Sequence, residues 1–441
     1  MTNDLLARAD ALEPLWETTA GPWSGFASLA SDGRSLSSEP RCDVAVVGGG
    51  FTGLSAALAL AQGGARVTLL EADSIGFRAS GRNGGQIVPG LKPRADHVIA
   101  AFGAERGRRM LDFAHAAAGR TFDLIARHGI DCDPTRNGWI QGAFSPLARD
   151  DLQRRAEINA QHGGDVEFLD AQRIAALTGT TFHHGGMIER GAGAVHPLKF
   201  ARALARAVAA AGGTLHEATR VTAVERAGAQ WAVITDSGTI VADRVILATD
   251  AYTGRLWPRL MQSLVNVTSA QLATAPLPPA LRSQILPKRA GVSETRKITY
   301  YYRIDPEGRF LIGGRGPSDD GLDRATIQRI ARAALERFPQ LAETPWAFGW
   351  SCRVAMTIDD MPHVHELAPG LWTAVGYCGR GVALAICLGE MLGKLALGAR
   401  ADDAAYPVTP LRRVPFYPLR QPGAAAAIIY YRMKDRLGLP T

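Results

Sequence analysis

Three glycines and a carboxylate in residues 43–71 are spaced to hold the phosphates and the ribose of a dinucleotide. Gly48 permits a tight turn, Gly50 lets a pyrophosphate approach the backbone, and Gly53 lets a helix pack closely against the preceding strand. The N-terminus of that helix would then lie beneath the phosphates. Glu71 follows the next apolar stretch and is placed to accept hydrogen bonds from an adenosine ribose. These residues predict a dinucleotide site and leave the identity of the dinucleotide open.

Two further glycine-rich runs could contact a flat polar ring. In residues 79–86, seven of the eight side chains are small or carry an amide, so this backbone can approach a ring and offer N–H donors. The run G-Y-C-G-R-G-V (376–382) precedes an apolar helix, whose first N–H groups would stabilise negative charge on a bound ring. We expect both runs beside the cofactor. A flexible loop and a plain turn into a packed helix are the respective alternatives.

Strands and helices from distant parts of the chain must position these runs. Strands are expected at 44–47 and 66–70 on either side of the first helix, with a partner strand at 244–248 and a closing helix at 382–397. The cofactor domain is therefore expected to be discontinuous, with a β-rich second domain threaded through it. The expected parts are an N-terminal arm (1–40), the cofactor domain (41–95, 150–260 and 346–400), the substrate domain (96–149 and 261–345) and a C-terminal tail (401–441).

The composition narrows the class of protein. The 441 residues are 46% hydrophobic and 21% charged, which is typical of a globular chain with more than one domain. The net charge of +7 comes from scattered arginines without a Lys/Arg block, which favours a solvated basic surface over nucleic-acid binding. The five cysteines show no metal-ligand spacing, so we expect no metal site. Reduced thiols and an N-terminus without a signal-peptide pattern favour a cytoplasmic protein.

The chain resembles the D-amino acid oxidase (DAO) family of FAD-dependent amine oxidoreductases. Within that family it is most similar to the γ-glutamylputrescine oxidases and to the bacterial pipecolate and sarcosine oxidases, over nearly its whole length. The most specific element is S-G-R-N-G-G-Q at 80–86. The motifs that carry the resemblance are C-D-V-A-V-V-G-G-G-F-T-G-L-S (42–55), I-G-F-R-A-S-G-R-N-G-G-Q (75–86), A-V-H-P-L (194–198), Y-Y-R (301–303) and G-Y-C-G-R-G-V (376–382).

The resemblance implies an α/β fold and FAD as the cofactor. The FAD/NAD(P)-binding domain would be Rossmann-like, of the glutathione-reductase type, with a mixed-sheet substrate domain over the flavin. The reaction implied is oxidation of a C–N bond, with O2 or a respiratory electron acceptor reoxidising the flavin. The residues expected to bind FAD are Gly48, Gly50, Phe51, Thr52, Gly53, Glu71, Ala72, Arg78, Ser80, Gly81, Arg82, Asn83, Gly84, Gly85, Gln86, Val221, Ala248, Gly376, Gly379, Arg380, Gly381 and Val382.

The sequence also departs from the sarcosine-type pattern. Those enzymes attach the flavin through a cysteine near the third run and hold the substrate carboxylate with a lysine in that run. Here Val382 and Ala383 follow Gly381, so the lysine is missing, and Cys352 does not match the attachment position. We therefore expect FAD to be bound noncovalently.

Five residues are candidates for the substrate side of the site. Arg353 and Arg315 suggest a carboxylate-bearing substrate, because a guanidinium binds a carboxylate through two hydrogen bonds; a structural ion pair is the alternative for each. Tyr300 and Tyr302 are expected on one face of a strand as aromatic walls, with core packing as the alternative. On position alone, Lys297 is a candidate for activating oxygen.

The sequence thus predicts an FAD-dependent oxidase or dehydrogenase of a small amine or secondary amino acid, such as L-pipecolate or γ-glutamylputrescine. A tRNA-modifying flavoprotein oxidase is the alternative, and a cofactor-holding protein without catalysis is less consistent with the complete set of flavin-facing runs. The apolar, basic tail at 428–439 is expected to dock on the protein itself in preference to a membrane.

Overall fold

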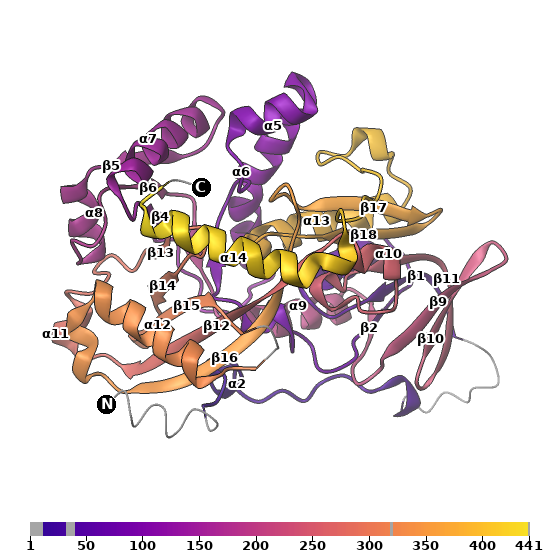
Figure 1. Ribbon diagram of the computed structural model, residues 1–441. Helices are drawn as coiled ribbons and strands as arrows, with labels where there is room; N and C mark the ends of the chain where they lie inside the picture. The colour runs from indigo at the N-terminus through magenta and orange to yellow at the C-terminus, as the bar shows by residue number, and fades with distance from the viewer. Residues whose placement is uncertain (1–11, 32–39, 318–320, 440–441) are drawn as a thin grey trace.

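The computed structural model describes residues 12–31, 40–317 and 321–439, and two large sheets organise the molecule (Figure 1). The first sheet has the order β17-β18-β11-β1-β2-β8, and β10 and β9 continue from β11 as an antiparallel extension. Its strands are β1 (Arg41–Val47), β2 (Val67–Leu70), β8 (Thr214–His216), β9 (Val221–Ala227), β10 (Gln230–Thr235), β11 (Gly238–Leu247), β17 (His363–Ala368) and β18 (Leu371–Val375).

The centre of this sheet is parallel, as the sequence predicted. Strand β1 lies between β2 and β11 and pairs in parallel with both. Its side chains are buried on both faces, with Val44 and Val46 in one apolar cluster and Ala45 and Val47 in another. Burial on both faces is the usual condition of a parallel strand, which explains the unbroken apolar run at 44–47.

Helices cover one face of the first sheet. They are α3 (Phe51–Gln62), α6 (Ala104–Arg127), α9 (Pro197–Ala210) and α13 (Gly381–Ala396). Helices α3 and α13 pack so closely that a Cβ on Gly389 would lie 2.4 Å from the carbonyl oxygen of Thr52. The other face carries Trp231 and the β9–β10 hairpin. This arrangement is the Rossmann-like α/β fold.

The second sheet has the order β16-β12-β15-β14-β13-β4-β6-β5 and forms the left half of the molecule in Figure 1. It is mixed, because β13 pairs in parallel with β4 whereas its other neighbouring pairs are antiparallel. Its strands are β4 (Trp139–Gly142), β5 (Val166–Leu169), β6 (Gly186–Glu189), β12 (Val265–Pro276), β13 (Gly291–Glu294), β14 (Tyr301–Ile304), β15 (Arg309–Arg315) and β16 (Trp346–Met356).

Shorter elements surround the two sheets. Helix α12 (Arg324–Arg337) buries Ile327 and Ile330 against the second sheet. A two-stranded sheet of β3 (Gln86–Ile87) and β7 (Gly193–Ala194) lies apart from both. The remaining α-helices are α2 (Leu15–Thr19), α4 (Ala79–Arg82), α5 (Ala95–Phe102), α7 (Pro146–Gln161), α8 (Ala171–Thr178), α10 (Pro258–Met261), α11 (Pro279–Arg282) and α14 (Arg420–Arg436). The 3₁₀ turns are η2 (Leu29–Ser31), η3 (Asp250–Tyr252), η4 (Pro339–Glu343), η5 (Ala401–Asp403) and η6 (Tyr417–Leu419).

The chain crosses between the two halves more often than the expected boundaries allow. Strands β5 and β6, expected in the cofactor domain at 150–260, pair in the second sheet, and so does β16, which begins the expected segment 346–400. Helix α6, expected in the substrate domain at 96–149, buries Met110 and Phe113 in the core beneath the first sheet. Apolar periodicity identified these elements, but it does not say which sheet an apolar face will cover.

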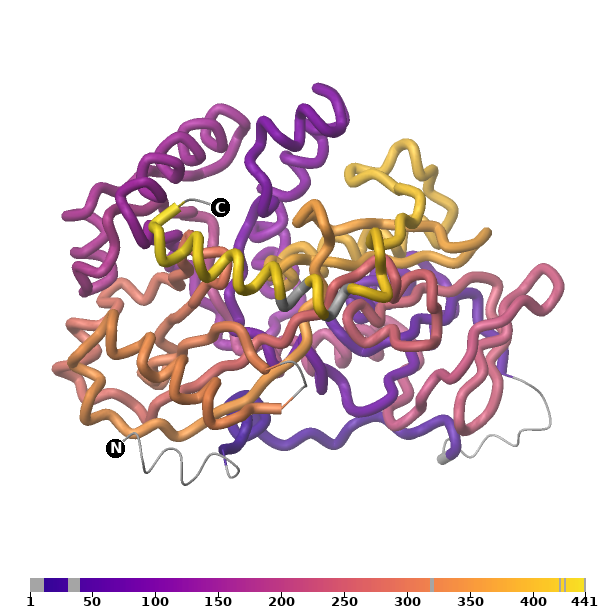
Figure 2. The backbone as a smooth tube through the Cα atoms, viewed as in Figure 1, coloured from indigo at the N-terminus to yellow at the C-terminus, as the bar shows by residue number. Residues whose placement is uncertain are grey.

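The C-terminal helix α14, yellow in Figures 1 and 2, lies across the front of the molecule and over both halves. Ser145 donates a hydrogen bond of 2.6 Å to the carbonyl oxygen of Gly438, just beyond the helix. The end of the tail thus contacts the protein itself. Within the described ranges, no helix is both long enough and apolar enough to cross a bilayer.

Candidate active site

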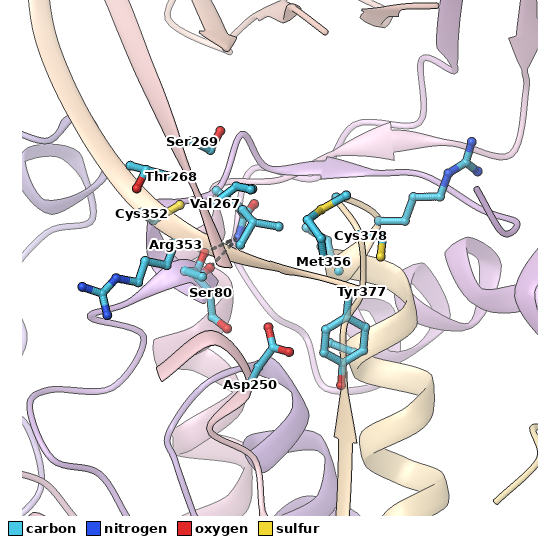
Figure 3. Close-up of a pocket in the computed structure, with 18 of the residues that line it drawn as sticks. Ser80, Asp250, Val267, Thr268, Ser269, Cys352, Arg353, Met356, Tyr377 and Cys378 are labelled. Atoms are coloured by element: carbon cyan, nitrogen blue, oxygen red, sulfur yellow. Dashed lines mark hydrogen bonds between the residues drawn. The ribbon is translucent and has the colours of Figure 1, made fainter. Parts of the chain in front are cut away.

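A cavity of about 1300 Å³ lies between the two sheets and is lined from both of them. The part of the molecule built on the first sheet contributes the β1–α3 turn, the residues after β2 and the start of α13. From the second half it receives β12, β14, β15 and β16. Figure 3 shows Ser80, Asp250 and Tyr377 on one side of this space and Val267, Ser269 and Met356 on the other.

The phosphate end of the cavity is built by close backbone packing. Gly48 has φ +112°, and a Cβ there would lie 2.8 Å from the carbonyl oxygen of Ala248. A Cβ on Gly53 would lie 2.0 Å from the carbonyl oxygen of Gly48, so only glycine lets α3 begin this close to β1. Gly50, Phe51 and the first turn of α3 border the cavity and direct the positive end of the helix dipole toward it.

Glu71 lies at the same, phosphate end of the cavity. Its carboxylate accepts hydrogen bonds from the backbone N–H of Gly49 (2.6 Å) and of Asp73 (2.9 Å). Burial raises the pKa of Glu71, and the two N–H donors only partly oppose this. Ala72, Val221 and Ala248 also border this region. A half-buried carboxylate beside the phosphate turn is the arrangement that binds a ribose diol.

Residues 79–86, which could have formed a flexible loop, include helix α4 and the first residue of β3, and hydrogen bonds from both sides hold this segment between the two sheets. The Ser80 hydroxyl accepts a hydrogen bond of 2.9 Å from the backbone N–H of Phe51. The guanidinium of Arg303 donates to the carbonyl oxygen of Gly84 (2.7 Å), and Trp350 and Gln271 donate to that of Arg82 (2.8 and 2.7 Å).

The predicted members of this loop divide into two groups. Arg78, Ser80, Asn83, Gly84 and Gln86 border the cavity. The cavity lining does not include Gly81, Arg82 or Gly85. A Cβ on Gly81 would lie 2.2 Å from the carbonyl oxygen of Gly76, and a Cβ on Gly85 would lie 2.2 Å from the carbonyl oxygen of Val195. These three residues position the loop and make no contact with the cavity.

The start of α13 borders the cavity through Gly379, Arg380, Gly381 and Val382. Gly376 is set back from the cavity, and its N–H donates to the carboxylate of Asp250 at 2.8 Å. Burial raises the pKa of Asp250 to about 6, against the effect of the N–H groups of Gly376 and Ala251. The hydroxyl of Tyr377 and that of Thr52 lie 2.6 Å apart and join the segment before α13 to α3.

The three tyrosines at 300–302, of which the last two begin β14, alternate as predicted, but the face that borders the cavity is the opposite one. Tyr302 is only 1% exposed, packs in the core and lies 2.6 Å from Nε2 of His183, while Tyr300 packs against the same core. Tyr301 borders the cavity, and its hydroxyl lies 2.7 Å from that of Ser269. The predicted wall residues Tyr300 and Tyr302 are therefore replaced by Tyr301, because β14 turns its other face to the helices.

The two predicted arginines lie on opposite faces of the second sheet. Arg315 pairs with Ser269, whose neighbour across the other ladder is Cys352, so all three share the face of Tyr301. Arg353 pairs with Thr268 on the other face, and its guanidinium lies 5.8 Å from the ring centroid of Tyr252.

Both arginines border the cavity. Figure 3 shows the Arg353 side chain extending away from Met356 and Tyr377. Burial lowers the pKa of Arg315, and the positive charges of Arg432 and Arg329 lower it further. Among the residues that the structure describes, no acidic side chain forms an ion pair with Arg315. A bound anion would relieve the repulsion among these three cations.

Lys297 lies at the cavity in a chain of ion pairs. Its ammonium contacts the carboxylate of Asp360 at 2.7 Å, and Lys92 contacts the same carboxylate at 2.8 Å. Burial opposes ionisation of Asp360, but the two ammonium groups outweigh it and lower its pKa. Lys297 is thus a paired cation on the rim.

Sequence reasoning missed Asp250, Ser269 and the cavity-facing role of Tyr301. Asp250 lies shortly after the carboxyl end of the parallel strand β11, where ligands of this fold bind, so its position was a usable signal. Ser269 on β12 and Tyr301 on β14 are 32 residues apart in the sequence. No local pattern marks such a pair.

The residues present fit a dinucleotide with a flat ring. The glycine turn and α3 suit the pyrophosphate, and Glu71 suits the ribose. The loop at 79–86 and the start of α13 offer backbone N–H groups to a ring placed between them. The strands of the second sheet would then cover that ring, and the part of the cavity between the ring and these strands is called the chamber below.

Comparison with known proteins agrees with this geometry. The sequence model of the DAO family, described as "FAD dependent oxidoreductase", matches residues 43–395. The chain is 32% identical over 401 residues to a probable oxidoreductase, OrdL, of Rhizobium meliloti, covering 90% of this chain and 92% of that one. It is 30% identical over 438 residues to gamma-glutamylputrescine oxidoreductase of Escherichia coli, covering 96% and 100%.

Solved structures show the same fold. Glycine oxidase of Geobacillus kaustophilus aligns with a TM-score of 0.67 at 24% identity, over 86% of this chain and 98% of that one. L-proline dehydrogenase of P. horikoshii aligns with a TM-score of 0.67 at 19% identity, over 81% and 94%. At these identities the likeness establishes the fold alone.

Proposed function

The chain belongs to the DAO family of FAD-dependent oxidoreductases, and on that premise we propose that it oxidises a C–N bond of a small, carboxylate-bearing amine or secondary amino acid. The proposed substrate class rests on the position of Arg315. This half-buried cation lies on the same sheet face as Tyr301 and Ser269. The relatives named for glycine and for gamma-glutamylputrescine act on amines that bear a carboxylate, which supports the proposal.

The reaction converts the amine to an imine with loss of two electrons and two protons, and water then hydrolyses the imine. When bound, FAD supplies the two-electron acceptor for this step, and oxygen or another acceptor takes up the electrons afterwards. The protein binds and orients the substrate. Arg315 holds the carboxylate through paired hydrogen bonds, and the ring of Tyr301 forms the wall beside the reacting carbon.

The Tyr301 hydroxyl and the N-terminal ends of two helices act on charge and hydrogen bonding in the cavity. Burial raises the pKa of Tyr301 far above its usual range, so its hydroxyl remains protonated and can donate a hydrogen bond. The N-terminal ends of α3 and α13 stabilise negative charge near them. FAD stays noncovalent: Cys352 and Cys378 border the cavity, but burial raises the pKa of the Cys378 thiol and so disfavours the thiolate that attachment would need, and Cys352 does not match the attachment position. Lys297 is the cation beside which oxygen would be reduced.

The test is a comparison of Arg315→Met with Arg353→Met in the FAD-loaded enzyme. Flavin bleaching without oxygen would first identify a substrate among γ-glutamylputrescine, pipecolate, sarcosine, proline and D-amino acids. We expect Arg315→Met to lower kcat/KM about 10- to 100-fold, mainly through KM, because a charged hydrogen bond contributes about 1.5–3 kcal/mol. Arg353→Met should have a smaller effect, because its guanidinium lies on the other face of the sheet.

The controls separate binding from folding. Arg315→Lys keeps the charge and should recover part of the lost kcat/KM, and a decarboxylated substrate should respond little to either substitution. An unchanged KM in Arg315→Met would contradict the assignment of the carboxylate. Flavin reduction that requires tRNA, or that occurs only with a nicotinamide, would contradict the proposed reaction. Flavin released intact by acid precipitation would support noncovalent binding.

A further inference from the structure

Helix α14 has two faces with different surroundings. Its inner face contributes Ala427, Ile428 and Tyr431 to the lining of the cavity. Near its end, the Asp435 carboxylate accepts a hydrogen bond of 3.4 Å from the backbone N–H of Lys297, and the Lys297 ammonium lies 5.6 Å from the Tyr431 ring centroid. The inner face is therefore occupied by the protein itself.

The outer face of the same helix is apolar and exposed. Ile429 is 70% exposed, Met433 54% and Leu437 64%, and these residues follow one another at intervals of four. Tyr430, at 51%, widens the same stripe. At about 100° per residue, the four side chains occupy an arc of about 100° opposite Ile428 and Tyr431. Large apolar side chains gathered on one exposed face mark a contact surface.

Cations accompany this stripe. On the same projection, Arg432 and Arg436 flank it on one side and Lys434 on the other. In residues 404–441 the sequence has the basic residues Arg412, Arg413, Arg420, Arg432, Lys434 and Arg436 and the single acidic residue Asp435. Because Asp435 faces inward, the exposed side of α14 combines apolar contact with positive charge.

We propose that the outer face of α14 lies on the surface of a bilayer that contains anionic lipids. A helix whose apolar stripe is flanked by Lys and Arg lies in the interface, with the stripe among the acyl chains and the cations at the headgroups. The absence of a spanning helix from the described ranges agrees with attachment to one leaflet. Since the inner face borders the cavity, the membrane contact and the catalytic chamber share one helix.

Charge complementarity favours lipid over a second copy of this chain. A twofold contact through α14 would bring Arg432, Lys434 and Arg436 of one copy against the same cations of the other, which is unfavourable. An anionic lipid surface instead neutralises these cations, and each of them near such a surface contributes to binding.

The experiment is sedimentation of the FAD-loaded enzyme with vesicles of phosphatidylcholine alone or mixed with phosphatidylglycerol. We expect binding to the mixed vesicles that weakens as salt is raised, because screening reduces the attraction of the cations. Ile429→Ser/Met433→Ser/Leu437→Ser should lower the partition coefficient at least about tenfold. Lys434→Gln/Arg436→Gln should reduce both binding and its dependence on salt.

Matched controls and oligomer measurements decide the outcome. Arg106→Gln/Arg108→Gln on α6 removes the same charge from another exposed surface and should leave vesicle binding unchanged. The flavin absorption spectrum and the activity without vesicles should be unchanged in the triple serine variant, since those side chains point away from the cavity. The proposal is overturned if the enzyme fails to bind mixed vesicles, or if it forms a dimer in solution that the serine variant dissociates.

Discussion

At the residue scale, alternation along the second sheet decides on which face of the sheet each polar group lies. The step from Tyr300 to Tyr301 to Tyr302 moves a tyrosine from core to cavity and back to core. Arg315 and Ser269 share the Tyr301 face, whereas Thr268 and Arg353 share the other. A period of two is visible in a sequence, but its phase depends on which face of the sheet the helices cover.

A buried histidine gives a prediction at this scale. His365 is 3% exposed, and its Nδ1 lies 2.6 Å from the carbonyl oxygen of Thr409. Burial lowers the pKa of His365 to about 4 from 6.5, so below pH 6.5 the unfolded chain takes up a proton that the folded chain refuses. The contribution of His365 to stability is therefore present above pH 6.5 and is lost as the pH falls toward 4.

The measurement compares the free energy of unfolding of wild type and His365→Asn at pH 7 and pH 5. The difference between the two proteins should shift by about 2 kcal/mol in favour of the variant at pH 5, since one proton is linked to unfolding. His184→Asn, at an exposed neighbour of buried His183, serves as control. A constant difference at both pH values would contradict this, because it would mean that the pKa of His365 is the same in the folded and unfolded chain.

At the element scale, the cofactor end of the cavity depends on how closely α3 approaches β1. A Cβ on Gly53 would lie 2.0 Å from the carbonyl oxygen of Gly48 and 3.2 Å from Cβ of Ala248. The clash is with backbone, so side-chain motion cannot relieve it. The same spacing places the N–H groups of the first turn of α3 at the cavity.

Gly53→Ala should therefore displace α3 and lower both stability and FAD affinity. Overpacking of this kind costs about 1–3 kcal/mol of folding free energy. The matched control is Gly119→Ala in α6, where an added Cβ meets nothing within 4 Å and should stabilise the helix by about 1 kcal/mol. Chemical denaturation and the flavin content of the purified proteins measure the two effects. Equal behaviour of the two variants would argue against the close approach.

At the scale of the whole molecule, the chamber belongs to neither half alone. The chain passes repeatedly between the sheets, so that β4, β5 and β6 of the second sheet lie in sequence between β2 and β8 of the first. The cavity receives residues from both sheets and from α14. A ligand in it would contact groups that are far apart in the sequence.

FAD should consequently stabilise both halves together. Protein saturated with free FAD at 100 times Kd should gain about 2.7 kcal/mol relative to the apoprotein, and Tm should keep rising with FAD concentration. Thermal scans at several FAD concentrations, followed by far-UV circular dichroism, provide the measurement. Riboflavin, which lacks the adenosine that Glu71 and the α3 turn would hold, is the control and should stabilise less. Two transitions of which only one responds to FAD would contradict this prediction.

The sequence by itself determined the βαβ unit, its phosphate turn and the acid that follows, because these depend on residues close together in the chain. Gly48, Gly53 and Glu71 lie where the motif requires them. Residues 79–86 and the start of α13 also border the cavity, since each adjoins a recognisable strand or helix; their contact with the cofactor stays a prediction.

Only the tertiary structure decided the substrate side and the division between the halves. The pairing of β12 with β15 and β16 put Arg315 on the sheet face of Tyr301 and Arg353 on the opposite face, and the packing of α12 turned Tyr302 into the core. The docking of α14 left Ile429 and Met433 exposed. Register, sheet membership and the buried face of a helix all depend on contacts between distant residues, which local patterns do not contain.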